Sequence, residues 1–151
     1  MASIYRTQRK KIVDAYVDEL KTKINGTSPY NSNLFNNVEG HTVFIDQITQ
    51  YPKVCVVAGD ETREYQPGGL KWRYLLLEIR VYVEDEEDPQ EELSLLLEDI
   101  ERVIDNNDVL TYDDSVSPNL NTTSSTILAI TTDEGVLTPL GVGEISIQVR
   151  Y

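Results

Sequence analysis

The segment Lys71–Asn106, KWRYLLLEIRVYVEDEEDPQEELSLLLEDIERVIDN, decides the fold because its hydrophobic period changes halfway. In the first half every second residue is apolar, namely Leu75, Leu77, Ile79, Val81 and Val83. This period predicts a strand from Trp72 to Glu84 with one buried face. In the second half the apolar residues recur at helical spacing, namely Leu93, Leu96, Leu97, Ile100, Val103 and Ile104. The segment therefore predicts a long strand followed by an amphipathic helix.

The junction between the two halves carries a helix-start signal. Asp88 can act as the N-cap, Pro89 suits the first helical position, and Glu91 stands three residues after the cap. The strand before it would be roughly 43 Å long at about 3.3 Å per residue. Because few strands exceed ten residues, we expect a bulge or an end that projects beyond the sheet.

The N-terminal half is expected to supply one helix and two short strands. An apolar stripe predicts a helix from Ser3 to Ile24. The apolar segments Thr42–Asp46 and Lys53–Val57 are of strand type. The segment Gly59–Gly69, GDETREYQPGG, is polar with glycine at both ends, and we expect it to be a loop.

The C-terminal half is expected to form a hairpin. Thr123–Thr132 predicts a strand with Thr126, Leu128 and Ile130 on one face. Gly143–Tyr151 predicts a closing strand whose inward residues are Ile145, Ile147, Val149 and Tyr151. Short connections between neighbouring strands favour antiparallel pairing. We therefore expect a single α+β domain, residues 1–151, with a mainly antiparallel sheet and two helices packed on one face.

The charge balance excludes several classes of partner. The chain carries 13 basic and 26 acidic side chains, a formal net charge of −13. Such a surface disfavours binding to nucleic-acid phosphate. No apolar run is long enough to cross a membrane, so we expect no membrane partner. The single cysteine, Cys55, rules out an internal disulfide.

The sequence offers no constellation that carries chemistry. His41 is the only histidine, and Cys55 lies in the apolar run VCVVAG, where a buried structural thiol is the usual finding. The spacing of these residues suits neither zinc nor a catalytic dyad, and the glycines do not form a phosphate-binding loop. We therefore expect no catalytic residue, no metal and no cofactor, and we do not expect an enzyme.

Some side chains are of the types that dominate protein interfaces. Arg63, Tyr65 and Trp72 lie close together in the sequence beside flexible glycines, without an evident role in the core. We expect these three residues to contact a partner or a second subunit.

The order of these segments resembles the tail terminator (tail completion) proteins of long-tailed bacteriophages, lambda type. The matching parts are the N-terminal helix, the segment QYPKVCVVAGDE at Gln50–Glu61, the polar segment before the long strand, the acids and proline that open the leucine-rich helix, and the strand EISIQVRY at Glu144–Tyr151. The resemblance implies a homohexameric ring that caps the tail tube, ends its polymerisation and joins the tail to a head-side connector or neck protein. It also implies a place at the neck end of the virion tail, after assembly in the host cytoplasm.

DNA would pass through such a ring without specific binding. Acidic walls repel phosphate, so we expect some acids to line the channel, and the candidates are Glu84, Asp85, Glu86, Glu87, Asp113 and Asp114. Three alternatives remain open at this point: another neck or head–tail connector protein, a small metal-dependent nuclease, and an acidic protein that mimics DNA.

Overall fold

The computed structural model describes residues 7–151 of the chain. A five-stranded sheet has the order β1-β2-β3-β7-β6, with bounds β1 (Val38–Glu39), β2 (Lys53–Tyr65), β3 (Lys71–Glu84), β7 (Leu140–Arg150) and β6 (Ser124–Thr132). The other elements are the helices α1 (Gln8–Lys23) and α2 (Pro89–Asp105), the short 3-10 helix η1 (Ile45–Gln47), and a two-stranded sheet of β4 (Thr111–Asp113) and β5 (Leu120–Asn121). The pair β1–β2 is parallel and the other strand pairs are antiparallel. The predicted α+β class with a mainly antiparallel sheet is confirmed.

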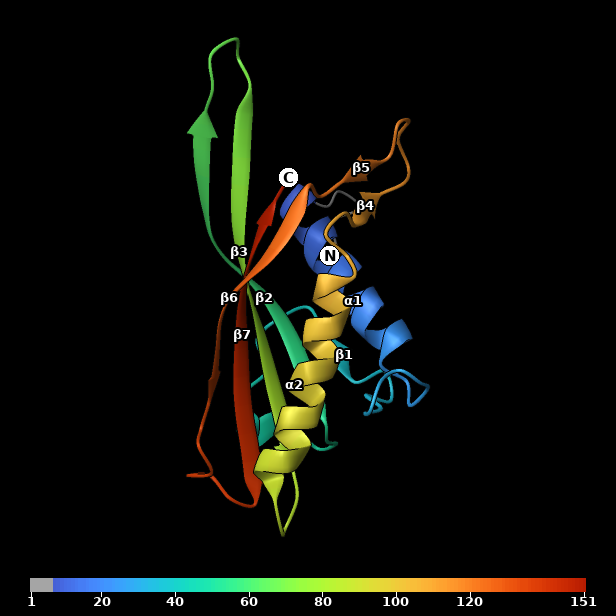
Figure 1. The fold of residues 1–151 in the computed structure, drawn as a ribbon, viewed down its shortest axis with the longest axis vertical. Helices are drawn as coiled ribbons and strands as arrows, with labels where there is room; N and C mark the ends of the chain where they lie inside the picture. Colours follow the sequence, from blue (N-terminus) through green and yellow to red (C-terminus); the bar gives the residue numbers. More distant parts are fainter. Residues whose placement is uncertain (1–6) are drawn as a thin grey trace.

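Strand β3 lies at the centre of the sheet and supplies the middle of the core. It pairs with β2 on one side and with β7 on the other. Its predicted inner face is fully or almost fully buried, with Leu75, Leu77, Ile79 and Val81 at 0% exposure. Both helices cover this one face (Figure 1), α2 over β3 and β7 and α1 over β2. The two-helix layer expected from the sequence is therefore present.

Helix α2 begins where its sequence predicts. The Asp88 carboxylate accepts a hydrogen bond from the Glu91 backbone N–H at 3.2 Å, and Pro89 is the first helical residue. All six residues of the predicted apolar stripe are buried. Helix α1 is capped by the Thr7 side chain, which accepts from the Lys10 N–H. The predicted start of α1 at Ser3 lies outside the described residues.

One charged residue lies inside the core side of α2. Asp99 is fully buried, and its carboxylate accepts hydrogen bonds from the backbone N–H groups of Asn31, at 2.9 and 3.0 Å, and of Ser32, at 2.7 Å. These bonds to a charged acceptor compensate for the burial of the carboxylate. They fasten the connection between α1 and β1 onto α2.

The predicted loop Gly59–Gly69 is wrong over most of its length. Strand β2 continues to Tyr65, after a register irregularity between Ala58 and Glu61, and a turn returns the chain to Lys71. Beyond the pair Tyr74–Arg150, β3 has no pairing with β7, so β2 and β3 alone project from the sheet. Figure 1 shows this two-stranded ribbon, residues 63–73, which we call the arm. The projecting end expected for the long strand is confirmed.

The predicted strand Thr42–Asp46 is also wrong. This segment leads into η1 and packs over the face of the sheet that the helices leave open. There Val43, Cys55 and Tyr82 form a small buried cluster, and the Tyr82 hydroxyl donates to the Val43 carbonyl oxygen at 3.2 Å. The apolar residues of the segment therefore act as a cover and not as a strand.

The predicted faces of β6 are wrong because the strand contains a bulge. The register shifts between Ile127 and Ala129, so that Ile127 pairs with Ile147 and Ile130 pairs with Ile145. Ile147 and Ile145 both point into the core. A bulge residue inverts the alternation that follows it, and Ile130 therefore lies on the face of Ile127, opposite to the prediction.

The orientation of α2 predicts a clear contrast between neighbouring positions. Ile100→Ala should lower the free energy of unfolding by about 2–5 kcal/mol, because Ile100 is fully buried and its loss leaves a cavity. Glu98→Ala is the control. Its side chain is 61% exposed, and the expected change is within about 0.5 kcal/mol. Urea unfolding of both variants measures the difference, and equal losses would contradict the assigned face.

Candidate functional site

The arm carries the three predicted interface residues, but on two different faces. In the register of β2 and β3, Arg63 pairs with Arg73 and Tyr65 pairs with Lys71, on the same face as the inward Leu75. Trp72 pairs with Glu64 on the opposite face. Tyr65 is 71% exposed and Trp72 37% exposed. The structure thus brings Arg63 and Tyr65 together and separates Trp72 from them.

A charged cluster ties the base of the arm to the rest of the domain. The Glu61 carboxylate accepts hydrogen bonds from Arg63 at 3.3 Å, from Arg9 of α1 at 3.4 Å and from the Tyr151 hydroxyl. Burial alone would raise the pKa of Glu61, but the hydrogen bonds from Tyr151 and Arg63 and the nearby guanidinium groups lower it. Burial, followed by the hydrogen bond to Glu61, raises the pKa of Tyr151 to about 12. At neutral pH Glu61 is therefore ionised and accepts the hydrogen bond, and Tyr151 is protonated and donates it.

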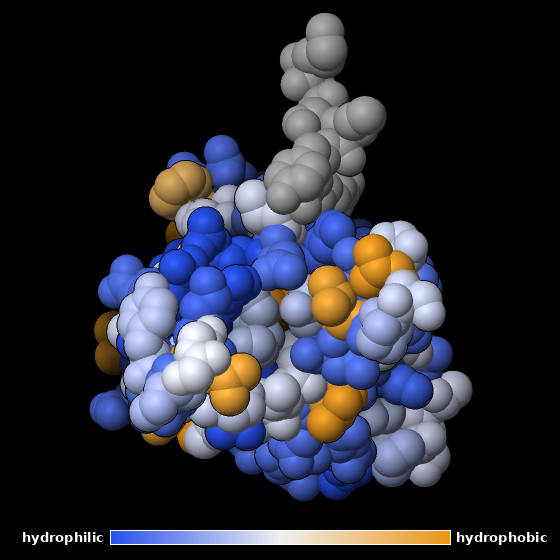
Figure 2. Space-filling model, turned by 90° about the horizontal axis from the view of Figure 1, so that it is seen from above, coloured by the Kyte–Doolittle hydropathy of each residue, from blue (hydrophilic) through white to orange (hydrophobic). Residues whose placement is uncertain are grey.

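Further arginines lie at the base of the arm on both faces of the ribbon. The Arg73 guanidinium carbon lies 5.4 Å from the centre of the Tyr151 ring, on the face of the Glu61 cluster, and that of Arg150 lies 4.3 Å from the centre of the Trp72 ring, on the opposite face. A pocket of about 240 Å³ is lined by Thr7, Gln8, Arg9, Arg63, Arg73 and Tyr151. Figure 2, which looks down on the arm end, shows a mostly hydrophilic surface with small separate apolar patches. The arm base is thus rich in cations in a chain of net charge −13.

Sequence reasoning found Arg63 but missed Arg9, Arg73 and Arg150. These residues come from α1, β3 and β7. The tertiary structure brings Arg9 and Arg73 to Arg63 and places Arg150 on the opposite face beside Trp72. A signal was present in the charge distribution, because basic residues are scarce in this chain and Arg9 belongs to a basic run near the N-terminus.

The acids of the turn before α2 have different roles. The Asp85 carboxylate accepts hydrogen bonds from the backbone N–H groups of Glu87, at 2.8 Å, and Asp88, at 3.2 Å, and so fixes the turn. Glu84, Glu86 and Glu87 are exposed. These three carboxylates remain candidates for a channel wall, whereas Asp85 has a structural role.

The second predicted acidic pair lies far from this turn. Figure 1 shows the β3–α2 turn at one end of the long axis, with β4 in the opposite half. Asp113 is buried, and its carboxylate lies 2.7 Å from the Lys11 ammonium group and also accepts from the Ser115 N–H and hydroxyl. The hydrogen bonds from Lys11 and Ser115 lower the pKa of Asp113 to about 2. Because Lys11 neutralises Asp113, we retain only the exposed Asp114 as a channel candidate.

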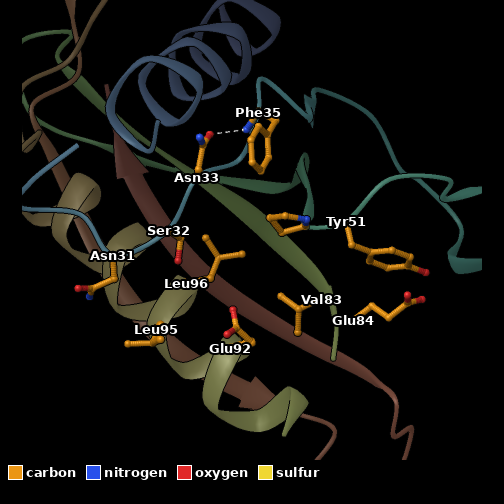
Figure 3. Close-up of a pocket in the computed structure, with 11 residues that line it drawn as sticks. Asn31, Ser32, Asn33, Phe35, Tyr51, Val83, Glu84, Glu92, Leu95 and Leu96 are labelled. Atoms are coloured by element: carbon orange, nitrogen blue, oxygen red, sulfur yellow. Dashed lines mark hydrogen bonds between the residues drawn. The ribbon is translucent and has the colours of Figure 1, made fainter. Parts of the chain in front are cut away.

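An open pocket of about 320 Å³ lies beside the acidic turn (Figure 3). It is lined by the connection before β1, by the end of β3 and by α2, and Val83 and Leu96 give it an apolar floor near Glu84 and Glu92. Asn33 holds the rim by accepting from the Phe35 N–H at 2.8 Å. The pocket is lined by carboxylates, amides, hydroxyl groups and apolar groups, and within the described residues the Ser32 hydroxyl has no hydrogen bond to a base.

Cys55 and His41 lie in different environments, one buried and the other exposed. Cys55 is fully buried, and burial raises the pKa of its thiol, whereas the His41 side chain is 70% exposed and lies 3.5 Å from a Glu39 carboxylate oxygen. Within residues 7–151, no group of three or more histidine, cysteine, aspartate or glutamate side chains is placed to hold a metal ion. None of the helices in the described range is long and apolar enough to cross a membrane.

Comparison with known proteins gives two consistent findings. A family model described as "Bacteriophage Tail Tube Terminator Protein" matches residues 6–151. The chain is also 39% identical over 150 residues to the "Tail tube terminator protein p142" of Escherichia phage T5, covering 95% of this chain and 92% of that protein. Both findings agree with the family resemblance drawn from the order of sequence segments.

The Lys11–Asp113 pair predicts a specific pH dependence. The pKa of Asp113 is depressed in the folded protein, so the pair stabilises the fold above about pH 4, and the stabilisation is lost as the pH falls toward about 2. We expect Asp113→Asn to be less stable than the parent at pH 7 and the gap to narrow at pH 3. Urea unfolding at the two pH values measures this. A gap that is unchanged at pH 3 would contradict the role of the ionised carboxylate.

Proposed function

Because the chain belongs to the bacteriophage tail tube terminator proteins, we propose that it forms a homohexameric ring that caps the tail tube. Membership of this family makes it a component of the virion tail. In the proposal the ring ends tube polymerisation and joins the tail to a head-side connector or neck protein. We further propose that residues 1–151 act as one domain, assembled in the host cytoplasm.

The observation that carries the proposal is the arm. It projects beyond the sheet, and Tyr65, Leu70 and Lys71 are exposed near its tip. None of these three side chains belongs to the buried core, and an arm that leaves its own domain is suited to reach a neighbouring molecule. Aromatic residues and arginine dominate the binding energy of protein interfaces, and the arm supplies both.

The charge distribution supports a channel for DNA. The exposed carboxylates Glu84, Glu86, Glu87 and Asp114 have no cation among their hydrogen-bond or ion-pair partners in the described range that would neutralise them. Where such groups face a channel, they repel phosphate and let DNA pass without binding.

The proposal excludes catalysis as the function of this chain. A structural role in the tail is what the family describes, and the arrangement of Cys55 and His41 offers no nucleophile. Another neck protein is the nearest alternative. Growth of purified tail tube protein with and without this chain separates the two, because a terminator yields tubes that stop growing, whereas a neck protein leaves tube length unchanged.

Removing the arm side chains should weaken assembly without unfolding the protein. The double variant Arg63→Ala/Tyr65→Ala should reduce ring formation or tube capping by about tenfold or more, since such anchors often contribute about 2 kcal/mol or more. Native mass spectrometry and tube-length measurements report the effect, and thermal unfolding confirms the fold. The double variant Lys23→Ala/Phe44→Ala removes an exposed cation and an exposed aromatic elsewhere and should behave like the parent. Equal capping by both variants would show that Arg63 and Tyr65 of the arm do not contribute to assembly.

Charge reversal tests the channel. Glu84→Lys, Glu86→Lys/Glu87→Lys and Asp114→Lys should slow DNA ejection from particles, and more so at low salt, because the Debye length is about 10 Å at 0.1 M. Glu98→Lys, on the exposed side of α2, is the control and should leave ejection unchanged. Normal ejection at low salt by the complete set of reversals would remove these acids from the channel and leave the ring proposal intact.

A further inference from the structure

Strand β6 is an unprotected edge of the sheet. It pairs with β7 on one side, and in the described part of the chain no strand pairs with its other side. Its sequence, SSTILAITT, contains no charged residue and no proline, and Leu128 and Ile130 are 52% and 40% exposed. Soluble proteins usually protect an edge of this length with lysine, proline or a covering element. An edge without these features is suited to pair with another strand.

The unpaired backbone groups of β6 can be assigned from the register. Asp133 N–H donates to the Val142 carbonyl oxygen at 3.0 Å. In an antiparallel ladder the direction of the N–H groups alternates, so Thr131 N–H points to β7, while Ile130 and Thr132 N–H point outward. The outward groups are the donors that an added strand would use.

The arm has a second free edge. Strand β1 pairs with β2 only at Val54 and Cys55, so that from Glu61 to Tyr65 β2 pairs with β3 alone. A two-stranded ribbon is at best marginally stable in water, and a third strand would stabilise it. The arm edge and the β6 edge therefore each lack a strand partner, and they are two different surfaces of the same copy.

Symmetry decides which edges meet. Two β6 strands that paired with each other would form a two-fold dimer in which both edges are used up. A closed ring needs a contact between two different surfaces on each copy. We propose that β6 of one copy pairs with the arm edge of β2 in the next copy, so that the sheet continues from subunit to subunit. This pairing rests on the proposed ring and identifies the surfaces that join it.

Main-chain hydrogen bonds would supply the affinity of this contact, as in other cases of strand addition. The exposed Leu128 and Ile130 would lose contact with water beside the arm. Arg63 and Tyr65 lie on the same strand of the arm and would be brought close to the neighbouring copy.

Hydrogen exchange of the protein bound to tail tubes tests the pairing directly. With exchange resolved to single amides by fragmentation and mass spectrometry, we expect the outward amides of Ile130 and Thr132 to exchange at least about 100-fold more slowly than in the free monomer. Thr131, which already bonds to β7, is the internal reference. Capped tubes in which Ile130 and Thr132 exchange at the monomer rate would overturn the pairing and leave the ring proposal standing. Failure to form rings and to cap tubes would overturn both.

A pair of substitutions at one position gives a second measurement. Ile130→Pro removes an outward N–H that β7 does not use, whereas Ile130→Ala removes the side chain and keeps the N–H. We expect the proline variant to form rings at least about tenfold less well than the alanine variant, with equal thermal stability of the monomers. Equal ring formation by two folded variants would overturn the pairing. If the proline variant does not fold, the exchange measurement alone decides.

Discussion

The burial of the inner face of β3 is the interaction on which the rest of the structure depends. Because this face packs against the helix layer, it has no room for charge along its middle, and the charged side chains in the middle of β3, Glu78 and Arg80, lie on the opposite face. On the helix side of the sheet, charged groups therefore lie beyond the two ends of this face. The arm base holds arginines from four elements, and the turn that leads into α2 holds exposed glutamates. One continuous apolar face thus separates a basic end of the domain from an acidic one.

The connection between the arm and the domain combines several weak contacts around Glu61. This carboxylate accepts hydrogen bonds from Arg9 of α1, from Arg63 of its own strand and from Tyr151. Each exposed ion pair of this kind contributes little alone, but a shared acceptor fixes the direction of several side chains at once. The arm can therefore leave the sheet and still keep a defined orientation at its base.

Period and capping signals predicted β3, α2, β7 and the α+β class, because each of these elements buries one face against the core. The arm part of β2 was missed since GDETREY has no core beneath it and so shows no apolar alternation. The bulge at Leu128 and the covering role of Val43 depend on the neighbouring strand and on Tyr82. Likewise, the neutralisation of Asp113 depends on Lys11, 102 residues away in the sequence. Such partners are set by tertiary structure and cannot be inferred from a local pattern.

The position of Cys55 has a consequence for the lifetime of the particle. A virion persists outside cells, where exposed thiols oxidise and neighbouring copies of a protein can become cross-linked. The only thiol of this chain is sealed between the sheet and the segment around Val43, and the reactive thiolate form is suppressed there. Copies of the protein thus cannot be joined through disulfides while they remain folded. Any contact that the folded chain makes with other virion proteins must therefore be stable without a disulfide from this chain.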